Sequence, residues 1–418
     1  MLRNDYGKVE VKSAPGWPDT VRPVTSPVGS APTPKERRPK QEQDPASEEV
    51  VEVAPGVLRM QLPVFMPGLG HVNMYGLVDD RGIAVVDPGL PGPRSWRAIQ
   101  KRLKAGGFRL EDVHTVIVTH SHPDHFGGAG RIAKETGAEL ITHSAFATFR
   151  VNASEAKRRE SLSEEAAQRL ELEAAAAAQY LDLGPDHDRL LDPLRADEDD
   201  LERTAASVAW AAETPWGGTK HVGPSLAKRL MFRALRLLYA PPNPTRRVRH
   251  GEMLQLAGRD WAAVHTPGHT LDHLCLYDPE HGVLLSGDHV LPSITPHVSG
   301  VGNGADSLKS YLDTLDLVAQ LDGVSLGLPA HGHPFADVPG RVVAIKEHHE
   351  ERMEQIRELS AALGPASVVD ISHELFPERH WGAMAESETF AHLEHLVADG
   401  RAERWREDDM LVYRVTSG

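Results

Sequence analysis

The stretch TVIVTHSHPDHFGG, residues 115–128, joins a run of β-forming residues to three histidines and an aspartate within six positions. The apolar run predicts a short buried strand that ends at the first histidine. His120, His122, Asp124 and His125 then offer imidazole and carboxylate groups, which are ligands that zinc and similar metals accept. Because the chain has 23 histidines, a polar loop that is rich in histidine by chance is the alternative interpretation.

Further single donors follow other predicted strands along the chain. The strand ends and their donors are IAVVDPG with Asp87, AAVHTPGHT with His269, GVLLSGD with Asp288 and VSLGLPAH with His331. In open α/β architectures the carboxyl ends of the strands form an edge at which sites are built. The motif and these distant donors together are sufficient for two adjacent metal ions, which makes a chance arrangement improbable.

These motifs give the chain a resemblance to the metallo-β-lactamase superfamily. The resemblance rests on THSHPDH, HTPGHT, LSGDH, LPAHG and VVDPG, and it covers about residues 50–335. It implies an α/β fold, an αββα sandwich with a dinuclear site along one edge. By position, one metal ion would be held by His120, His122 and His269, and the other by Asp124, His125 and His331. Asp288 would bridge the two ions, and Asp87 would orient the ligands from behind.

The resemblance also implies a metal-dependent hydrolase. Two divalent cations lower the pKa of a bound water molecule and polarise a carbonyl or phosphoryl oxygen of the substrate. Asp124 and Asp288 are the expected catalytic residues, because both hold metal and Asp124 could also relay a proton. Zinc is the expected metal, and iron or manganese would accept the same ligands.

The chain divides into three predicted parts. Residues 1–47 are rich in Pro, Ser, Lys and Glu, a composition that predicts a disordered tail. Residues 48–340 form the predicted metallo-β-lactamase domain, interrupted by a helical lid insertion over about residues 146–250. Residues 341–418 read as three helices and a hairpin that turns at Asp408 and Asp409, which predicts a winged-helix-like domain.

The insertion and the histidines near the motifs supply candidate substrate contacts. Between Thr214 and Gly251 the chain has eight basic residues and no acidic one. An amphipathic helix within this segment carries Arg229 and Arg233 on a different face from its leucines. A lid of this kind suits a small-molecule or carrier-bound acyl thioester whose carrier bears phosphate, and it could touch an anionic membrane surface. The alternative is an ordinary helix whose arginines neutralise the acidic remainder of the protein.

Two further resemblances bear on the substrate. GHTLDH resembles the glyoxalase II-like branch and places His273 beside the site. SGDHVLPSITPHVS resembles a subfamily with a C-terminal winged helix, whose members include a ribonuclease and polyketide-type thioesterases. His289 and His297 thereby become candidates for the pocket rim, with hydrogen-bonded structural histidines as the alternative. The expected function is acyl thioester hydrolysis. A ribonuclease or phosphodiesterase, a lactone or β-lactam hydrolase, and a regulatory scaffold remain alternatives.

Charge and composition narrow the partners and the location. The formal net charge is −15, and residues 341–418 carry nine basic against sixteen acidic residues. Nucleic acid is therefore an unexpected partner, and packing or oligomerisation is the expected role of the C-terminal domain. The single cysteine, Cys275, lies in an apolar run and reads as a core residue. No apolar run of transmembrane length and no apolar signal segment is visible, so a cytoplasmic location is expected.

Overall fold

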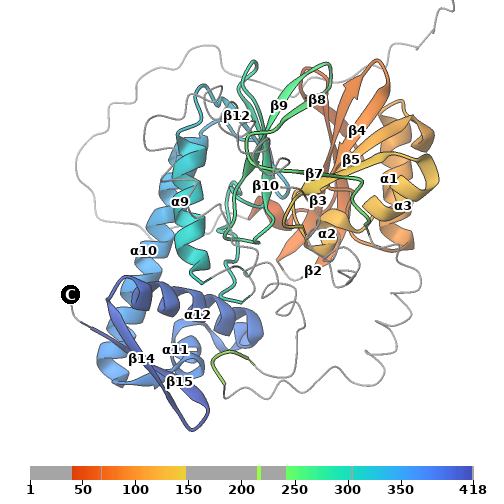
Figure 1. Cartoon of the computed structure of the whole chain (residues 1–418). Helices are drawn as coiled ribbons and strands as arrows, with labels where there is room; N and C mark the ends of the chain where they lie inside the picture. The colour runs from red at the N-terminus through yellow and green to blue at the C-terminus, as the bar shows by residue number, and fades with distance from the viewer. Residues whose placement is uncertain are drawn as a thin grey trace, which may run out of the picture.

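The computed structural model describes residues 40–146, 214–217 and 242–416, apart from residues 67, 302 and 304. The predicted tail before residue 40 lies outside these ranges. Most of the predicted insertion does so as well, including the helix with Arg229 and Arg233. The arrangement of the described elements is shown in Figure 1.

The first sheet has seven strands that lie side by side in chain order. They are β1 (Val50–Ala54), β2 (Val57–Met66), β3 (Leu69–Asp79), β4 (Gly82–Val86), β5 (Val113–Ile117), β6 (Glu139–His143) and β7 (Arg246–Val248). The pairs from β1 to β4 are antiparallel, and those from β4 to β7 are parallel. Strand β7 falls within the predicted helical insertion, which therefore ends before residue 246.

Helices α1 (Pro93–Ala105) and α3 (Ala129–Thr136) cover the outer face of this sheet. Helix α1 starts with a proline, whose fixed φ suits the first helical turn. Its residues Trp96, Ile99 and Leu103 recur at helical spacing, and all three are buried in the core beneath the sheet. The short helix α2 (Pro123–Phe126) lies between them in sequence and carries two of the four donors of the histidine-rich motif, Asp124 and His125.

The second sheet has five strands in the order β12-β11-β10-β9-β8. They are β8 (Met253–Leu256), β9 (Arg259–His265), β10 (Leu274–Asp278), β11 (Val283–Gly287) and β12 (Leu326–Pro329). Strands β9 and β11 are both antiparallel to β10, and β12 is parallel to β11. The carboxyl ends of β9, β11 and β12 therefore meet at one edge. Helices α9 (Ser307–Ala319) and α10 (Val338–Leu363) cover the outer face.

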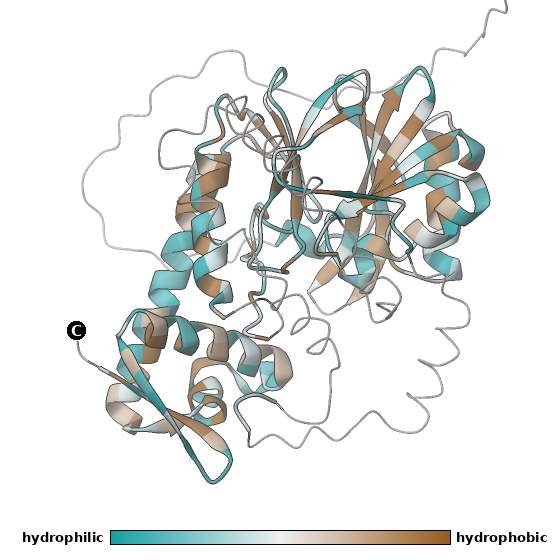
Figure 2. Cartoon of the chain, in the orientation of Figure 1, coloured by the Kyte–Doolittle hydropathy of each residue, from teal (hydrophilic) through white to brown (hydrophobic). Residues whose placement is uncertain are grey.

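The two sheets pack face to face over a buried apolar layer. Tyr75 and Ile117 of the first sheet belong to the same core cluster as Trp261 and Leu276 of the second. In Figure 2 the strands are predominantly hydrophobic, whereas the covering helices also carry hydrophilic residues. Burial of these apolar side chains is the main force that holds sheet against sheet. The predicted α/β sandwich with outer helices is confirmed.

The C-terminal part continues from α10 into two more helices and a small sheet. The elements are α11 (Val368–Leu375), α12 (Ala383–Ala398), β13 (Ala366–Ser367), β14 (Ala402–Glu407) and β15 (Met410–Val415). Asp408 and Asp409 have φ of 45° and 64°, which is the geometry of a tight hairpin turn. Helix α10 ends before Gly364, whose φ is 74°. The element order matches the expectation, and the winged-helix interpretation stays a prediction.

Two segments that the sequence assigns to a tail or an insertion are docked on the folded core. In the 3-10 turn Gln41–Gln43, the fully buried Glu42 accepts hydrogen bonds from the backbone N–H groups of Ser293 and Ile294. The predicted disorder up to residue 47 is therefore wrong for residues 40–47, because this carboxylate satisfies donors far away in sequence. Trp216 is likewise buried, against Phe390 of α12. Among the described residues, no helix combines the length and apolar character needed to cross a membrane.

Candidate metal centre

The seven predicted metal ligands come together at one edge of the sandwich. His120 and His122 lie between β5 and α2, and Asp124 and His125 lie on α2. The other three donors follow the carboxyl ends of β9, β11 and β12 within one to four residues: His269, Asp288 and His331. Two groups of donor atoms result, the first of His120, His122, His269 and Asp288, and the second of Asp124, His125 and His331.

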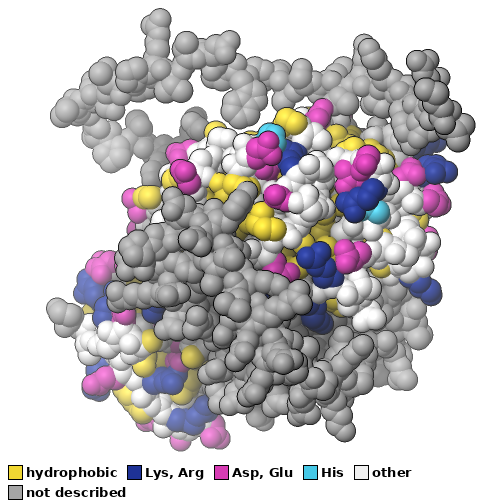
Figure 3. All heavy atoms as spheres, turned by 45° about the horizontal axis from the view of Figure 1, so that its top comes forward, with side chains coloured by type: hydrophobic (Ala, Val, Ile, Leu, Met, Phe, Trp, Pro, Cys, Tyr) yellow, Lys and Arg dark blue, Asp and Glu magenta, His cyan; other side chains and the backbone are white. Residues whose placement is uncertain are grey.

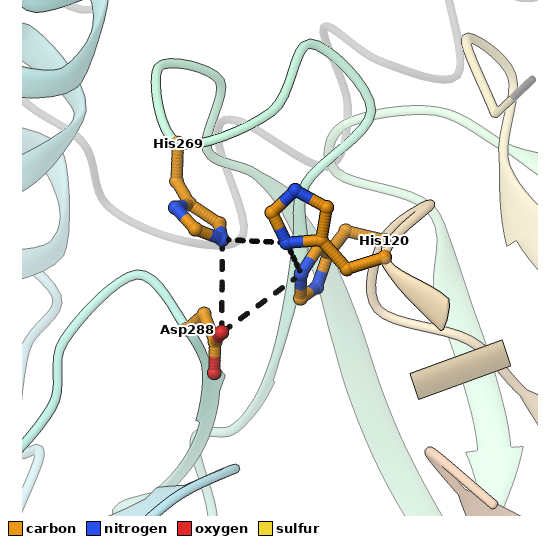
Figure 4. Close-up of side chains that lie close together, drawn as sticks. His120, His269 and Asp288 are labelled. Carbon is orange, nitrogen blue, oxygen red and sulfur yellow. Dashed lines mark hydrogen bonds and ion pairs between the residues drawn. The ribbon is translucent and has the colours of Figure 1, made fainter. Parts of the chain in front are cut away.

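In the first group, three ring nitrogens face one another closely. The Nδ1 atom of His122 lies 3.0 Å from Nε2 of His120 and 3.1 Å from Nε2 of His269. The carboxylate of Asp288 completes the group, with Oδ2 3.6 Å from Nε2 of His269 and 3.9 Å from Nε2 of His120. Figure 4 shows the side chains of His120, His269 and Asp288 converging on one point.

Asp288 also joins the first group to the second. Its Oδ2 atom lies 3.5 Å from Nε2 of His125, and its Oδ1 atom lies 3.4 Å from Nε2 of His331. The Oδ2 atom of Asp124 lies 3.4 Å from Nε2 of His331 and 3.6 Å from Nε2 of His125. Asp288 is thus the residue shared by both groups, in the position expected of a bridging ligand.

Hydrogen bonds on the far side of the rings fix which nitrogen points inward. The Nδ1 atoms of His331 and His269 donate to the backbone carbonyls of His71 and His297, at 2.6 and 2.7 Å. Since a carbonyl can only accept, these nitrogens carry a hydrogen, and each Nε2 points into the site. The Nδ1 atom of His125 donates in the same way to Asp87, at 2.9 Å.

Asp87 organises the base of the site. Its carboxylate accepts hydrogen bonds from the Thr119 backbone N–H and hydroxyl, at 2.8 and 2.7 Å, in addition to that from His125. The Thr119 oxygen in turn lies 3.0 Å from Nδ1 of His120. Asp87 has φ of 55°, a conformation uncommon for residues other than glycine. Strain of this kind persists where surrounding contacts over-determine the backbone.

The donor set fits divalent metal ions. Several buried side-chain atoms have no hydrogen-bond partner within the described chain, and three of them belong to the predicted ligands: Nε2 of His125, Nε2 of His331 and Oδ1 of Asp288. Burying such atoms without a partner is costly. In the first group, the donor atoms of all four residues lie within 4.8 Å of one another, close enough to share one ion. Imidazole and carboxylate ligands that are held from behind are typical of metal sites in proteins.

The charges in the site shift its titration strongly. Burial, with the nearby histidines, lowers the pKa of His120 well below its usual value. Burial also lowers the pKa of His331, but Asp288 and Asp124 outweigh it and raise that pKa to about 10. Burial raises the pKa of Asp288, but His331 and His125 outweigh this effect and hold that pKa well below its usual range. Asp288 therefore stays ionised, as a metal-bridging carboxylate must be.

The three predicted rim histidines occupy different places. His273 is fully buried, where its Nδ1 lies 2.7 Å from the Thr266 hydroxyl and its Nε2 accepts the backbone N–H of Asp288 at 3.0 Å. His289 is also fully buried, edge-on to the ring of Tyr311. Neither lies at a rim, because both sit beneath the loops that carry the ligands. His297 is partly exposed beside His269, and its role at the pocket rim stays a prediction.

Several residues that support the site were not identified from the sequence. His71 is fully buried and receives the hydrogen bond from His331, and Thr119 links Asp87 to His120. Asn303 donates to the backbone carbonyl of His269 at 2.9 Å. Of these residues, only Thr119 could have been suspected from the sequence, because it directly precedes His120. His71 acts through its carbonyl, which any residue type could supply.

An αββα sandwich with two neighbouring His/Asp clusters at one edge defines a class of metal-dependent hydrolases. Comparison with known families agrees, because the sequence model of the Metallo-beta-lactamase superfamily matches residues 67–331. The chain belongs to this superfamily, and its donor groups are of the kind that could hold metal ions.

Known relatives are similar over parts of the chain. The lactamase-like protein nscB of Trichophyton equinum is 35% identical over 108 residues, which are 25% of this chain and 29% of that protein. The lactamase-like protein aptB of Emericella nidulans is 29% identical over 162 residues, which are 37% of this chain and 48% of that protein. The matches thus span less than half of either relative.

Two solved structures are similar over most of the chain. A metallo-beta-lactamase family protein from Thermus thermophilus has 27% identity and a TM-score of 0.61, covering 87% of this chain and 100% of that chain. A beta-lactamase domain protein from Burkholderia ambifaria has 26% identity and a TM-score of 0.63, covering 89% of this chain and 96% of that chain. Both likenesses extend well beyond the matched residues 67–331.

Proposed function

We propose that the chain hydrolyses a carbonyl-type bond, that of an acyl thioester, at this metal centre, and that the metal is zinc. The observation that carries the proposal is the pair of adjacent donor groups that share Asp288. Two ions that share one carboxylate leave positions open for a water molecule and a substrate oxygen. Phosphoryl and carbonyl substrates both meet this requirement, so the choice between them depends on features outside the donor set.

The residues of the chain have separate roles in this proposal. His120, His122 and His269 would hold one ion, and Asp124, His125 and His331 the other, with Asp288 between them. Bound metal would lower the pKa of water and stabilise negative charge on the carbonyl oxygen. The carboxylate of Asp124 would accept a hydrogen bond from the attacking water or relay its proton. The outer hydrogen bonds of the His125, His269 and His331 rings would hold these donors in place.

The preference for a thioester rests on the basic segment between Thr214 and Gly251. Its eight basic residues and lack of acidic ones would attract the phosphate groups of an acyl carrier. The rest of the chain is strongly acidic, so this basic segment would favour contact with an anionic carrier. Arg229 and Arg233 are the proposed contacts, and His297 is the proposed contact beside the metal.

A matched substrate panel tests the proposal. The zinc-loaded protein is assayed on an acyl-CoA thioester, the corresponding oxygen ester, a lactone and a β-lactam, and each assay is repeated after chelation. The expected result is metal-dependent cleavage of the thioester with the highest kcat/KM. Faster cleavage of the lactone or β-lactam would reassign the substrate class. An equal rate in the chelated protein would exclude the metal mechanism.

A phosphodiesterase is the second candidate, favoured by the three helices and hairpin of the C-terminal part. Its weakness is charge, because residues 341–418 carry nine basic against sixteen acidic residues. In Figure 3 the Lys and Arg side chains of the described residues lie among Asp and Glu side chains on the face shown. Cleavage of single-stranded RNA with zinc or manganese at a rate above that of the thioester would favour this candidate.

A further inference from the structure

The segment from His297 to Asn303 lies between helix α12 and the metal ligand His269. On the helix side, the hydroxyl of Ser299 lies 2.8 Å from that of Ser387. The backbone N–H of Gly300 donates to the carbonyl of Ser387 at 3.3 Å. The segment is therefore attached to the C-terminal part of the chain at two consecutive residues.

The same segment holds the ligand from its other side. The carbonyl of His297 accepts the hydrogen bond from Nδ1 of His269 at 2.7 Å. The side-chain amide of Asn303 donates to the carbonyls of Gly268 and His269, at 3.2 and 2.9 Å. Both the ring and the backbone of His269 thus take their position from this segment.

Close packing leaves the segment little freedom to move relative to the helix. A Cβ atom placed on Gly300 would lie 2.6 Å from the ring of Phe390 and 2.8 Å from the backbone nitrogen of Ala391. The backbone of Gly300 therefore packs directly on the backbone of α12. A displacement of α12 would displace the segment as well.

Glu388 is the charged contact across this junction. Its Oε2 atom lies 3.5 Å from Nδ1 of His297, and its Oε1 atom lies 3.8 Å from Nε of Arg352 on α10. Burial raises the pKa of Glu388, but His297, His392 and Arg352 outweigh it and lower that pKa to about 2. The carboxylate is therefore ionised at neutral pH and attracts His297 toward the helix.

We propose that Glu388 is a positioning residue for the metal ligand His269, acting through His297, and that the C-terminal part thereby controls metal binding at the first donor group. The inference rests on the proposed metal-dependent function. Neither Glu388 nor Ser387 lies within the residues that match the family model. The site is thus completed by a part of the chain that the family match does not include.

The second donor group has different supports, so the effect should be confined to one ion. His125 is held by Asp87, and His331 by the carbonyl of His71. Both supports belong to the first sheet or to its strand ends, and within the described part of the chain their hydrogen bonds do not involve α12. Loss of Glu388 should weaken the first ion and leave the second in place.

The test compares three variants of the full chain: Glu388→Ala, Glu388→Gln and the control Glu394→Ala. Glu394 is on the same helix but pairs with Arg404 and with the hydroxyl of Tyr413, away from the site. The readouts are zinc stoichiometry and chelator competition for each ion, with kcat and KM measured beside them. Anomalous diffraction from Glu388→Ala crystals locates the ion that remains.

Glu388→Ala is expected to bind one of its two ions about tenfold more weakly, at the lower end of the loss that follows removal of a supporting partner, because Glu388 acts on His269 only through His297. The retained ion should lie at Asp124, His125 and His331. Glu388→Gln should lose about threefold, since a neutral hydrogen bond is about half as strong as a charged one. Because glutamine preserves the shape of the side chain, this variant still tests the role of the charge if the alanine variant folds poorly. The control should match the wild type in both affinities.

Three outcomes would overturn the inference. They are wild-type affinities in Glu388→Ala, wild-type affinities in Glu388→Gln, and equal weakening of both ions in either variant. If the wild-type protein itself binds no metal, the proposed function fails as well. A wild type with two ions and an unaffected Glu388 variant overturns the positioning role alone, so the two failures are distinguishable.

Discussion

The carboxylate of Asp87 holds the ring of His125, with 2.9 Å between Oδ2 and Nδ1. The same carboxylate also accepts two hydrogen bonds from Thr119. A residue at the end of β4 therefore sets the orientation of a ligand on α2 and of the residue that precedes His120. The metal centre depends on this contact although Asp87 belongs to neither donor group.

Asp87→Asn tests this contact without disturbing the backbone, because asparagine tolerates positive φ. The asparagine side chain would place an NH2 group, which can only donate, where the Asp87 carboxylate accepts hydrogen bonds from Thr119 and His125. We expect metal affinity and kcat/KM to fall by about 10- to 100-fold, the usual loss when a supporting partner of a ligand is removed. Metal analysis and steady-state kinetics are the measurements. Asp79→Asn, which disturbs only the contacts of Asp79 with Arg81 and His114, should bind metal as the wild type does.

His120→Ala removes a donor from the first group and should abolish both metal at that group and turnover. The matched control is His114→Ala on the preceding strand, where the histidine pairs with Asp79 and is remote from the donor groups. Zinc content and thioesterase rate are measured for both. Turnover in His120→Ala equal to that of His114→Ala would show that the first donor group is not needed.

Much of the site could be predicted because its ligands follow strands. A strand such as Val283–Gly287 is short, apolar and wholly buried, so its end and the donor Asp288 are visible in the sequence. The residues that follow the carboxyl ends of parallel strands lie at the same edge of the sheet. Their proximity can therefore be predicted without knowledge of long-range contacts. The fold class and the gathering of the seven candidate donors followed from this regularity together with the resemblance.

The supports of the ligands could not be predicted in the same way. His71 and His297 act through backbone carbonyls, which leave no mark on residue type. Glu42 lies 251 residues from Ser293, and Glu388 lies 91 residues from His297, in stretches whose composition indicates a tail and a helix surface. His273 is buried beside the site and not at its rim. Its position depends on the pairing of β10 with β11, which brings its ring under the N–H of Asp288.

Trp216 anchors the predicted insertion to the C-terminal part. Its indole N–H donates to Glu386 at 3.0 Å, its ring packs on Phe390, and its carbonyl accepts the N–H of Leu411. We expect Trp216→Ala to lower the free energy of unfolding by about 3–5 kcal/mol, the range for removing a large buried ring. Urea unfolding measures the change.

Trp216→Phe separates the ring from its hydrogen bond. Packing is largely retained, so the expected loss is about 1.5–3 kcal/mol, as for a hydrogen bond to a charged group. Trp381→Phe is the matched control, since its indole donates to the carbonyl of Phe376 at an exposed position. A loss in the control as large as that in Trp216→Phe would contradict a special role for the buried contact.

The buried pair His349 and His392 makes stability depend on pH. Nδ1 of His392 donates to the Glu388 carbonyl, so its Nε2 accepts from Nδ1 of His349, at 3.0 Å. Burial lowers the pKa of His392 to about 4 and, with the charge of His392, that of His349 to about 2. The unfolded chain takes up these protons near pH 6.5, whereas the folded chain excludes them. Stability is therefore complete above pH 6.5 and falls as pH drops from 6.5 toward 4.

For His392 alone, a shift from 6.5 to about 4 corresponds to about 3 kcal/mol. His392→Gln should be less stable at pH 7, because the pair loses its geometry, but its stability should fall less steeply between pH 6.5 and 4. Urea unfolding at several pH values gives both slopes, and the difference between variants removes effects of metal loss that they share. His380→Gln, at an exposed position, should retain the wild-type slope. Identical slopes in His392→Gln and the wild type would mean that the pair does not cause the loss of stability in acid.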